Sequence, residues 1–387
     1  MDLIYFDHIS GTPIHTAVRE VMIKYIEQGG FYNPSSQHHL GDLALETLED
    51  ARSKVAGLIN SKPDEIVFTS GGTESINHAI KGVAFARAKK GRHIITSNIE
   101  HQSVSRTLRV LMNMGYQVTA VNVDRYGLVD PDDVKKAIRD DTILITIMHA
   151  NNEIGTIEPI AEIGRIAREK GIVMHTDAVV SCGNITVDVE AMNVDLLSMA
   201  ANQFYGPPGV GALYIRKKTP IYPIIDGGTQ ENNQRAGTQN MIGIVGMAKA
   251  AELASIEMPS RTEHLLKLKR YFLERLKEID EIVINGHPDN SLPGLVSFSV
   301  EYVEGESMMI MLDEKGICVS TRSACASGSL RASHVLIATG SDYATAQGTL
   351  LFSFGIDNTI EQIDRAFEVL KDTIGFLRNI SPLYKKK

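Results

Sequence analysis

The segment Phe68–Ser75 reads FTSGGTES and joins the end of a short apolar run to a glycine turn and the start of a helical pattern. Exposed N–H groups at a helix N-terminus attract phosphate, and the Thr73 hydroxyl can add a hydrogen bond. An ordinary turn capped by Thr or Ser is the alternative interpretation. A strand that passes through a glycine turn into a helix is also the repeating unit of an α/β sheet.

Helical and strand patterns alternate on both sides of this segment. Helices are predicted at 44–58, 73–86 and 104–114, and short buried strands at 65–69, 93–96, 117–123, 142–148 and 172–175. Such alternation is typical of a mostly parallel sheet flanked by helices on both faces. Ligands of such sheets bind at the carboxyl ends of the strands.

A long helical pattern at 243–279 leads into a region that mixes strands and helices in another order. Strands are predicted there at 294–300, 317–320 and 349–353, and helices at 307–315 and 359–378. This pattern indicates an α+β arrangement. We therefore expect a large α/β domain over 14–255 and a smaller α+β domain over 1–13 and 256–387.

Charge and cysteine content limit the class of protein. The 387-residue chain has a formal net charge of −8, and its only cationic cluster is the terminal Lys385–Lys387, which argues against a nucleic-acid-binding surface. No apolar run is long enough to span a bilayer, and the N-terminal residues do not follow a signal-peptide pattern. Three cysteines suit free thiols in a reducing cytosol. We expect a cytoplasmic protein that binds neither nucleic acid nor membrane.

Polar side chains gather near the ends of the predicted strands. Asp177, in HTDAVVS, comes just after one strand, where a carboxylate can pair with a ring nitrogen or cap a helix. His101, in NIEHQSV, ends another strand; it can stack on a flat ligand, move a proton or serve the structure alone. The segment His149–Pro159, HANNEIGTIEP, offers two amides and a carboxylate to a polar substrate.

Cys325 is the strongest candidate for a reactive side chain. It lies in STRSACASGSL, Ser320–Leu330, among small residues that give a thiol little apolar cover. Cys318 follows Gly-Ile and fits the apolar setting of a buried thiol, and Cys182 partly does.

Taken in order along the chain, these segments resemble the cysteine desulfurases of the iron–sulfur assembly type, which are class V, fold-type I pyridoxal-phosphate enzymes. The motifs that carry the resemblance are FTSGGTES, HANNEIGT, YGPPGVGALYIR, RAGTQN and SACASGSL. The similarity covers nearly the whole chain, from YFDHISGTP near the N-terminus to ISPLY near the C-terminus. It implies a fold-type I pyridoxal-phosphate transferase fold and a homodimer.

The resemblance also implies roles for particular residues. The implied cofactor contacts are Gly72 and Thr73 to the phosphate, His101 stacked on the pyridine ring, Asn152 to the ring hydroxyl or the substrate carboxylate, Asp177 to the ring nitrogen, and Thr238 to the phosphate of the neighbouring subunit. Cys325 would attack the substrate sulfur and carry it as a persulfide to an iron–sulfur scaffold protein.

Several positions depart from the family pattern around the implied site. The departures are Gln203 for the lysine that binds the cofactor covalently, Asn202 for a histidine, Ala200 for a phosphate-binding serine, Val180 for a glutamine, Leu351 for the arginine that anchors the substrate carboxylate, and Arg322 for a glycine. A carboxamide is neither nucleophilic nor basic near neutrality, so Gln203 cannot take over the catalytic work of the lysine.

These departures predict a desulfurase-like protein of iron–sulfur cluster assembly whose turnover of cysteine is reduced or lost. Cys325 would handle sulfur as a persulfide or as a cluster ligand, and pyridoxal phosphate would bind without a covalent bond or be absent. The alternative is an active cysteine desulfurase that uses non-covalently bound pyridoxal phosphate. A pyridoxal-phosphate enzyme for another amine is disfavoured, because its substrate would also need the lysine.

A shared iron–sulfur cluster is a further expectation. Clusters take thiolate ligands, and histidine can replace cysteine on one iron. In this chain NPSS runs directly into Gln37-His38-His39, so His38 and Cys325 are the candidate iron ligands. The alternative is that both histidines are surface residues of a loop.

Overall fold

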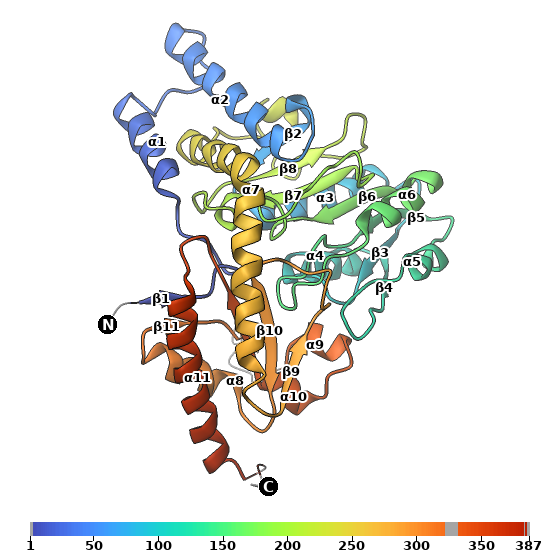
Figure 1. Cartoon of the computed structure of the whole chain (residues 1–387). Coiled ribbons are helices and arrows are strands. Elements are labelled where there is room, and N and C mark those ends of the chain that lie inside the picture. The colour runs from blue at the N-terminus through green and yellow to red at the C-terminus, as the bar shows by residue number, and fades with distance from the viewer. Residues whose placement is uncertain (1–2, 322–331, 383, 385–387) are drawn as a thin grey trace.

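The computed structural model describes residues 3–321, 332–382 and 384. Its largest element is a seven-stranded sheet (Figure 1). In spatial order the strands are β2 (Ile66–Thr69), β8 (Gly211–Ile215), β7 (Leu196–Ala200), β6 (Val173–Asp177), β5 (Thr142–Thr146), β3 (His93–Ser97) and β4 (Gln117–Val121). β8 runs antiparallel to both of its neighbours, and the other neighbouring pairs are parallel.

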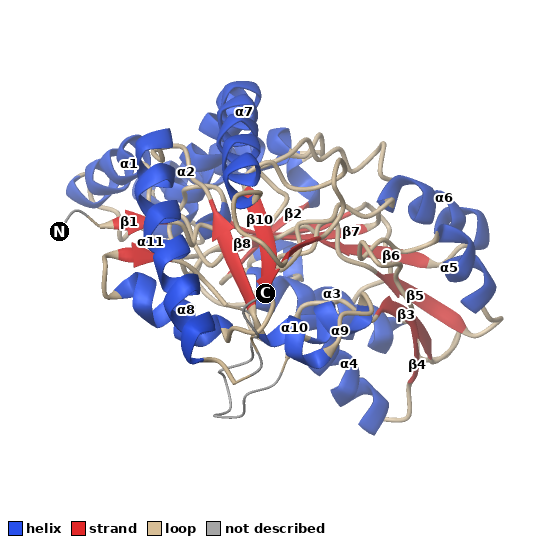
Figure 2. Ribbon diagram, turned by 60° about the horizontal axis from the view of Figure 1, so that its bottom comes forward, coloured by secondary structure: helices blue, strands red, loops and turns tan. Residues whose placement is uncertain are grey.

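Helices cover both faces of this sheet (Figure 2). One face carries α3 (Gly72–Ala86) and α4 (Gln102–Asn113), and the other carries α1 (Thr16–Glu27), α2 (His39–Leu58), α5 (Pro131–Ala137), α6 (Ile160–Lys170) and α7 (Met241–Leu276). Successive strand residues alternate between the two cores: Ile94 packs with α3 and α4, and Ile95 packs with the other group. The predicted α/β fold with a mostly parallel sheet is confirmed.

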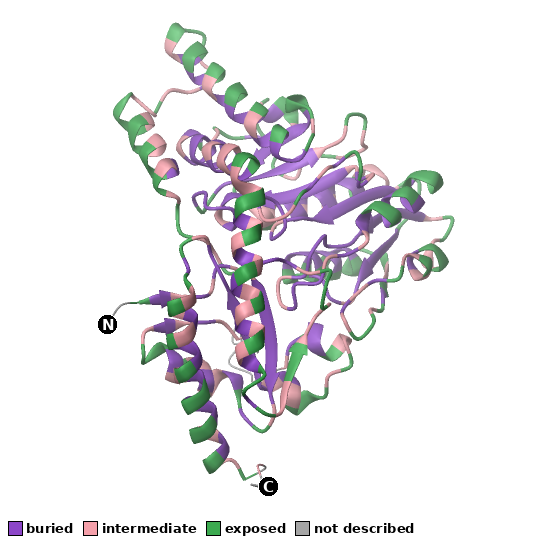
Figure 3. Ribbon diagram, viewed as in Figure 1, coloured by how far each residue is buried: buried purple, intermediate pink, exposed green. Residues whose placement is uncertain are grey.

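A second core forms beside the large sheet. It contains an antiparallel sheet of β9 (Ile282–Asn285), β10 (Leu295–Val300) and β12 (Thr349–Ser353), the short pair β1 (Ile4–Tyr5) and β11 (Ile317–Cys318), and the helices α8 (Gly305–Asp313) and α11 (Ile360–Ile380). Two short helices, α9 (His334–Ala338) and α10 (Tyr343–Gln347), lie nearby. Buried residues concentrate on the strands and on the inward faces of the helices (Figure 3).

Helix α7 connects the two cores. Its first half, up to Ala254, packs in the core of the large sheet, and its second half, from Leu265, packs in the second core. Pro259 lies inside the helix, between the two halves. The division of the chain into domains at residue 255 stays a prediction.

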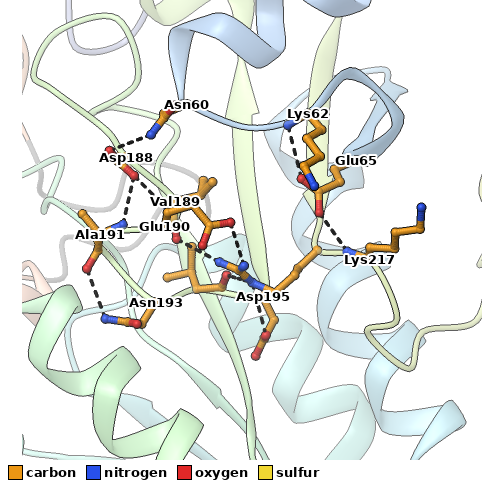
Figure 4. A network of polar contacts seen from close by, with 12 residues as sticks. Asn60, Lys62, Glu65, Asp188, Val189, Glu190, Ala191, Asn193, Asp195 and Lys217 are labelled. Carbon is orange, nitrogen blue, oxygen red and sulfur yellow. Dashed lines mark hydrogen bonds and ion pairs between the residues drawn. The ribbon is translucent and has the colours of Figure 1, made fainter.

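A polar network closes the amino-terminal edge of the large sheet (Figure 4). Arg216, which follows β8, donates to the carbonyl of Val194 at 3.0 Å and to Glu190 Oε1 at 2.8 Å. Glu65, which precedes β2, accepts from the backbone N–H of Lys217 at 3.0 Å. These contacts join β8 to the segments that precede β7 and β2. We therefore infer that the network stabilises the sheet.

Helices α1, α5, α6, α9 and α10 were not predicted from the sequence. Only Val18 of α1 is buried, so its apolar pattern is weak. None of the helices in the described part of the chain combines the length and the apolar character needed to cross a membrane.

Candidate functional site

A cavity of about 360 Å³ lies at the carboxyl ends of the strands of the large sheet. Its lining comes from the segments that follow β2, β3 and β5, from the end of β6, from the end of β7 with the turn after it, and from the N-terminal segment. Of the residues singled out in the sequence, the lining includes Gly72, Thr73, His101, Asn152, Asp177, Val180, Ala200, Asn202 and Gln203. The structure therefore brings these candidates together, and their individual roles stay predictions.

The N-terminus of α3 forms one side of the cavity. The first N–H groups of an α-helix have no intrahelical acceptor, and in the described residues nothing accepts from Gly72 or Thr73. Gly71 adopts φ +147°, and a Cβ at Gly72 would lie 2.5 Å from Val179 Cγ2. The glycines therefore allow this helix start to approach the end of β6 closely, where its N–H groups suit a phosphate.

Asp177 forms the floor of the cavity. It is the last residue of β6, whereas the sequence analysis placed it just after the strand. Its Oδ1 accepts from the N–H of Val179 at 3.0 Å, and within the described chain the other oxygen has no hydrogen-bond partner. Burial raises the pKa of Asp177, while the N–H of Val179 acts in the opposite direction. The free oxygen can accept a hydrogen bond from a protonated ring nitrogen.

His101 caps the N-terminus of α4, four residues after β3, so the prediction that it ends a strand was wrong. Its Nδ1 accepts from the Ser103 N–H at 3.2 Å and lies 2.7 Å from Ser103 Oγ. A neutral ring that accepts at Nδ1 carries its proton on Nε2. Ser103 therefore sets both the tautomer and the orientation of the imidazole that borders the cavity.

Asn152 lies on a loop that several hydrogen bonds hold in place. The side chain of the preceding Asn151 accepts from the N–H groups of Glu153 and Ile154 and donates to the carbonyl of Ile99 at 3.0 Å. The last contact ties the Asn152 loop to the segment that leads into His101. The loops that carry Asn152 and His101 follow different strands, and this hydrogen bond joins them.

Gln203 occupies the position where the resemblance implies the lysine. It lies in the short helix η2 (Ala201–Gln203), is buried, and donates from Nε2 to the carbonyl of Ile9 at 3.2 Å. Among the described residues that line the cavity there is no lysine. In this part of the chain no amine is therefore available for a covalent bond to a ligand in the cavity.

The other candidates lie elsewhere. Thr238 is exposed on the loop before α7 and is not part of its own chain's cavity. His38 is exposed at the N-terminus of α2, where its Nδ1 accepts from the N–H of Gly41 at 3.2 Å. Cys325 and Arg322 lie outside the described residues. Within the described ranges, no three His, Cys, Asp or Glu side chains are grouped so that they could hold a metal ion.

Several residues in or beside the cavity were not singled out in the sequence, among them Ile9, Ser10 and Glu100. Ile9 and Ser10 line the cavity although they come from the N-terminal segment, and no local pattern indicates this. Glu100, next to His101, is fully buried; its Oε1 accepts from Ser97 Oγ at 2.6 Å and from the Met148 N–H at 3.0 Å. Burial raises the pKa of Glu100 to about 8, so it is protonated at neutral pH. Mostly polar residues surround Glu100 in the sequence, so no local pattern indicated that it would be buried.

The buried acids predict a pH-dependent stability. The unfolded chain releases the Glu100 proton near the ordinary pKa of 4.5, whereas the folded protein keeps it up to about pH 8. The pKa of several buried histidines is lowered, so they add stability as the pH rises toward 6.5. Above about pH 6.5 the acids dominate, and the free energy of unfolding is expected to fall by a few kcal/mol, in order of magnitude, between about pH 6.5 and 8. Burial also raises the pKa of Glu158 to about 8, so Glu100→Gln should remove roughly half of the slope.

Urea unfolding followed at several pH values measures this slope. Glu46 is exposed on α2, so Glu46→Gln is a matched control that should leave the slope unchanged. Equal stability of the wild-type protein at both ends of the window would contradict the prediction.

The chain is similar to known proteins along nearly its whole length. The family described as Aminotransferase class-V matches residues 4–366. The chain is 52% identical to the cysteine desulfurase IscS of Dictyoglomus turgidum over 385 residues, which cover 99% of this chain and 97% of that protein. It is 49% identical to the cysteine desulfurase IscS of Methanosarcina thermophila over 384 residues, with 99% and 95% covered.

A solved structure described as a NifS-like protein has the same fold. It superposes with a TM-score of 0.91 at 38% identity and covers 97% of this chain and 100% of its own. The similarity extends over both cores, because the aligned part contains nearly all of the chain.

Proposed function

Because the chain belongs to the class-V aminotransferase family and is similar to cysteine desulfurases along nearly its whole length, we propose that it is a cysteine desulfurase-like protein of iron–sulfur cluster assembly. It handles sulfur on Cys325 and has reduced or lost the conventional turnover of cysteine. The observation that carries the proposal is the cavity that unites Asp177, His101 and the start of α3 but has Gln203 where the covalent lysine is implied.

The cavity residues fit pyridoxal phosphate held without a covalent bond. The N–H groups of Gly72 and Thr73 would bind the phosphate, the free oxygen of Asp177 would accept from the ring nitrogen, and His101 would lie against the ring. When bound, the cofactor supplies an electron sink for an amine substrate. Asn152, whose loop is held by the hydrogen bonds of Asn151, would bind the ring hydroxyl or the substrate carboxylate.

Gln203 removes the two functions that a lysine would perform. Its amide cannot form an imine, and it cannot take a proton from carbon. One of its two Nε2–H groups is donated to the Ile9 carbonyl, so the side chain joins the N-terminal segment to the cavity lining. These are the grounds for proposing that cysteine turnover is reduced or lost.

Cys325 would then act as a sulfur carrier or cluster ligand for a scaffold protein in the cytoplasm. As a carrier, its thiolate would attack the outer sulfur of a small persulfide, and the donor thiolate would leave. As a cluster ligand it would act together with His38, whose Nε2 is the ring nitrogen left for iron because Nδ1 accepts from Gly41.

The second candidate is an active cysteine desulfurase that uses non-covalently held pyridoxal phosphate, and the retained set of cofactor-binding candidates in one cavity favours it. Mass spectrometry of Cys325 separates the two. Under the first proposal, glutathione persulfide loads Cys325 and L-cysteine with added pyridoxal phosphate does not. Rapid loading by L-cysteine would establish the second, and Cys325→Ser is the control for both.

The three thiols are expected to differ in reactivity. Cys182 is fully buried, and burial raises its pKa. Burial and the neighbouring Asp313 also raise the pKa of Cys318. The thiolate is the reactive form, so a thiol reagent should modify Cys325 well before the other two. Peptide mapping after brief labelling measures this order, and equal rates at the three sites in the folded protein would refute it.

We also propose a homodimer. Helices α1 and α2 project from the large sheet (Figure 1) and carry exposed apolar side chains that include Ile23, Ile26 and Leu43. A second copy would cover this surface, and the exposed Thr238 would then be available to the cavity of the partner. Sedimentation at micromolar concentration should give the dimer mass, and a monomer would contradict the proposal.

A further inference from the structure

One wall of the cavity is apolar. We call Ile9, Ala150, Val179 and Val180 the apolar wall, because all four line the cavity and belong to one hydrophobic cluster. Behind them the same cluster contains Leu292, Leu295 and Leu351, which are 4%, 4% and 1% exposed. A hydrophobic layer therefore lies behind the wall, and a second cavity of about 40 Å³ remains between Val180 and the two leucines Leu292 and Leu295.

The layer joins the two cores. Val180 follows β6 of the large sheet, whereas Leu351 is the central residue of β12 in the smaller sheet, where it pairs with Ser297. The Leu351 N–H also donates to the carbonyl of Ser320 at 2.8 Å. Leu351 is thus fixed by its strand on both sides, and its side chain adds to the packing behind the wall.

No cationic side chain faces this wall from the described lining. The sixteen lining residues include neither lysine nor arginine, and one of the two N–H groups of the Gln203 amide is donated to Ile9. The lining does contain the carboxylate of Asp177. Because Asp177 would already be paired with the ring nitrogen of the bound ligand, it offers a second carboxylate no attraction. Such a carboxylate would lose its water and gain no ion pair from the lining that the structure describes.

We infer that the apolar wall selects against an α-carboxylate, so that the cavity binds a phosphopyridoxyl ligand with an uncharged substituent in preference to an amino-acid adduct. This inference rests on the proposed cofactor site, and it concerns binding rather than turnover. Val180 and Leu351 are the residues that determine the selectivity: Val180 forms the surface of the wall, and Leu351 fills the space behind it.

Two stable probes test the selectivity. N-phosphopyridoxyl-L-alanine and N-phosphopyridoxyl-ethylamine are reduced secondary amines that differ only in the carboxylate, and neither needs a lysine for binding. Equilibrium titration of the full-length protein, followed by the fluorescence of the pyridine ring, gives both dissociation constants. We expect the ethylamine adduct to bind at least about tenfold more tightly, which corresponds to one lost charge-assisted contact.

The outcomes separate this inference from the proposed function. Equal affinity, or tighter binding of the alanine adduct, would show that the apolar wall does not select against the carboxylate. It would not contradict the proposed cofactor site. If neither adduct binds, and free pyridoxal phosphate does not bind either, the cofactor site itself fails, and the inference fails with it.

Two variants test the named residues. Leu351→Arg places a cation behind the wall and should reverse the preference, with Leu351→Met as the control that keeps the preference of the wild type. Because a buried arginine can prevent folding, Val180→Gln provides a second test: it adds an amide donor at the surface of the wall and should reduce the preference severalfold. Circular dichroism verifies that each variant folds. An unchanged preference in a folded Leu351→Arg protein and in Val180→Gln would overturn the assignment.

Discussion

Borohydride reduction in the presence of pyridoxal phosphate is expected to attach the cofactor to the Gln203→Lys protein and to leave the site of the wild-type protein unmodified. Position 203 is buried, borders the cavity, and lies on the same short turn as Asn202. A lysine there would lose its hydration, which lowers its pKa and frees the amine for imine formation. The expected change is from no labelled peptide to nearly complete labelling.

The measurement is peptide mapping of the reduced protein by mass spectrometry. Asn202→Lys is the matched control, because residue 202 also lines the cavity and carries the same new amine one position away. After dialysis the Gln203→Lys protein should retain the cofactor, whereas the wild-type protein should lose it. A wild-type chain that is labelled at a native lysine of this cavity would refute the non-covalent binding that we propose.

Loss of the Arg52–Glu231 ion pair is expected to have the largest effect on stability. Arg52 on α2 contacts Glu231 through two N–H···O bonds of 2.6 and 3.1 Å, and the two side chains are 4% and 1% exposed. Glu231 also accepts from the Phe68 N–H at 2.8 Å and from Gln239 at 3.0 Å. The pair thus joins α2, β2 and the loop that carries Thr238.

Arg52→Ala would leave the carboxylate of Glu231 buried without its counter-ion, and the expected loss in the free energy of unfolding is about 3–5 kcal/mol. Urea unfolding measures it. Lys54→Ala is the control, because Lys54 pairs with Asp50 at the surface and its loss should cost roughly 0–1 kcal/mol. The double variant Arg52→Met/Glu231→Gln removes both charges and should recover part of the loss. A loss in Arg52→Ala as small as the control would contradict the prediction.

The ion pair between Arg52 and Glu231 also supports the conformation of the loop that carries Thr238. Glu231, Asn232 and Asn233 all adopt positive φ angles of 48°, 55° and 65°, a conformation that is unfavourable for residues other than glycine. Such a conformation persists only where the surrounding contacts hold it. The buried carboxylate of Glu231 supplies these contacts, so Arg52→Ala should also disorder the loop that carries Thr238.

The sequence alone was sufficient for the architecture and for most of the candidate site. Gly72 follows a predicted strand and Asp177 lies at the end of another, and the carboxyl ends of parallel strands meet at the same edge of a sheet. Gln203 was assigned to the same site by the family resemblance, through the motif that surrounds it. The substitution at position 203 was visible in the same way, since a motif is a local property of the chain.

Contacts between distant parts of the chain were decided only by the tertiary structure. Ile9 meets Gln203 across 194 positions, and Arg52 meets Glu231 across 179. Leu351 belongs to a strand whose pattern indicated only that it is buried, and it becomes part of the apolar wall's support because the second core packs against the cavity. Local patterns record which face of a strand or helix is buried, whereas the partner across a core depends on how all the elements pack together.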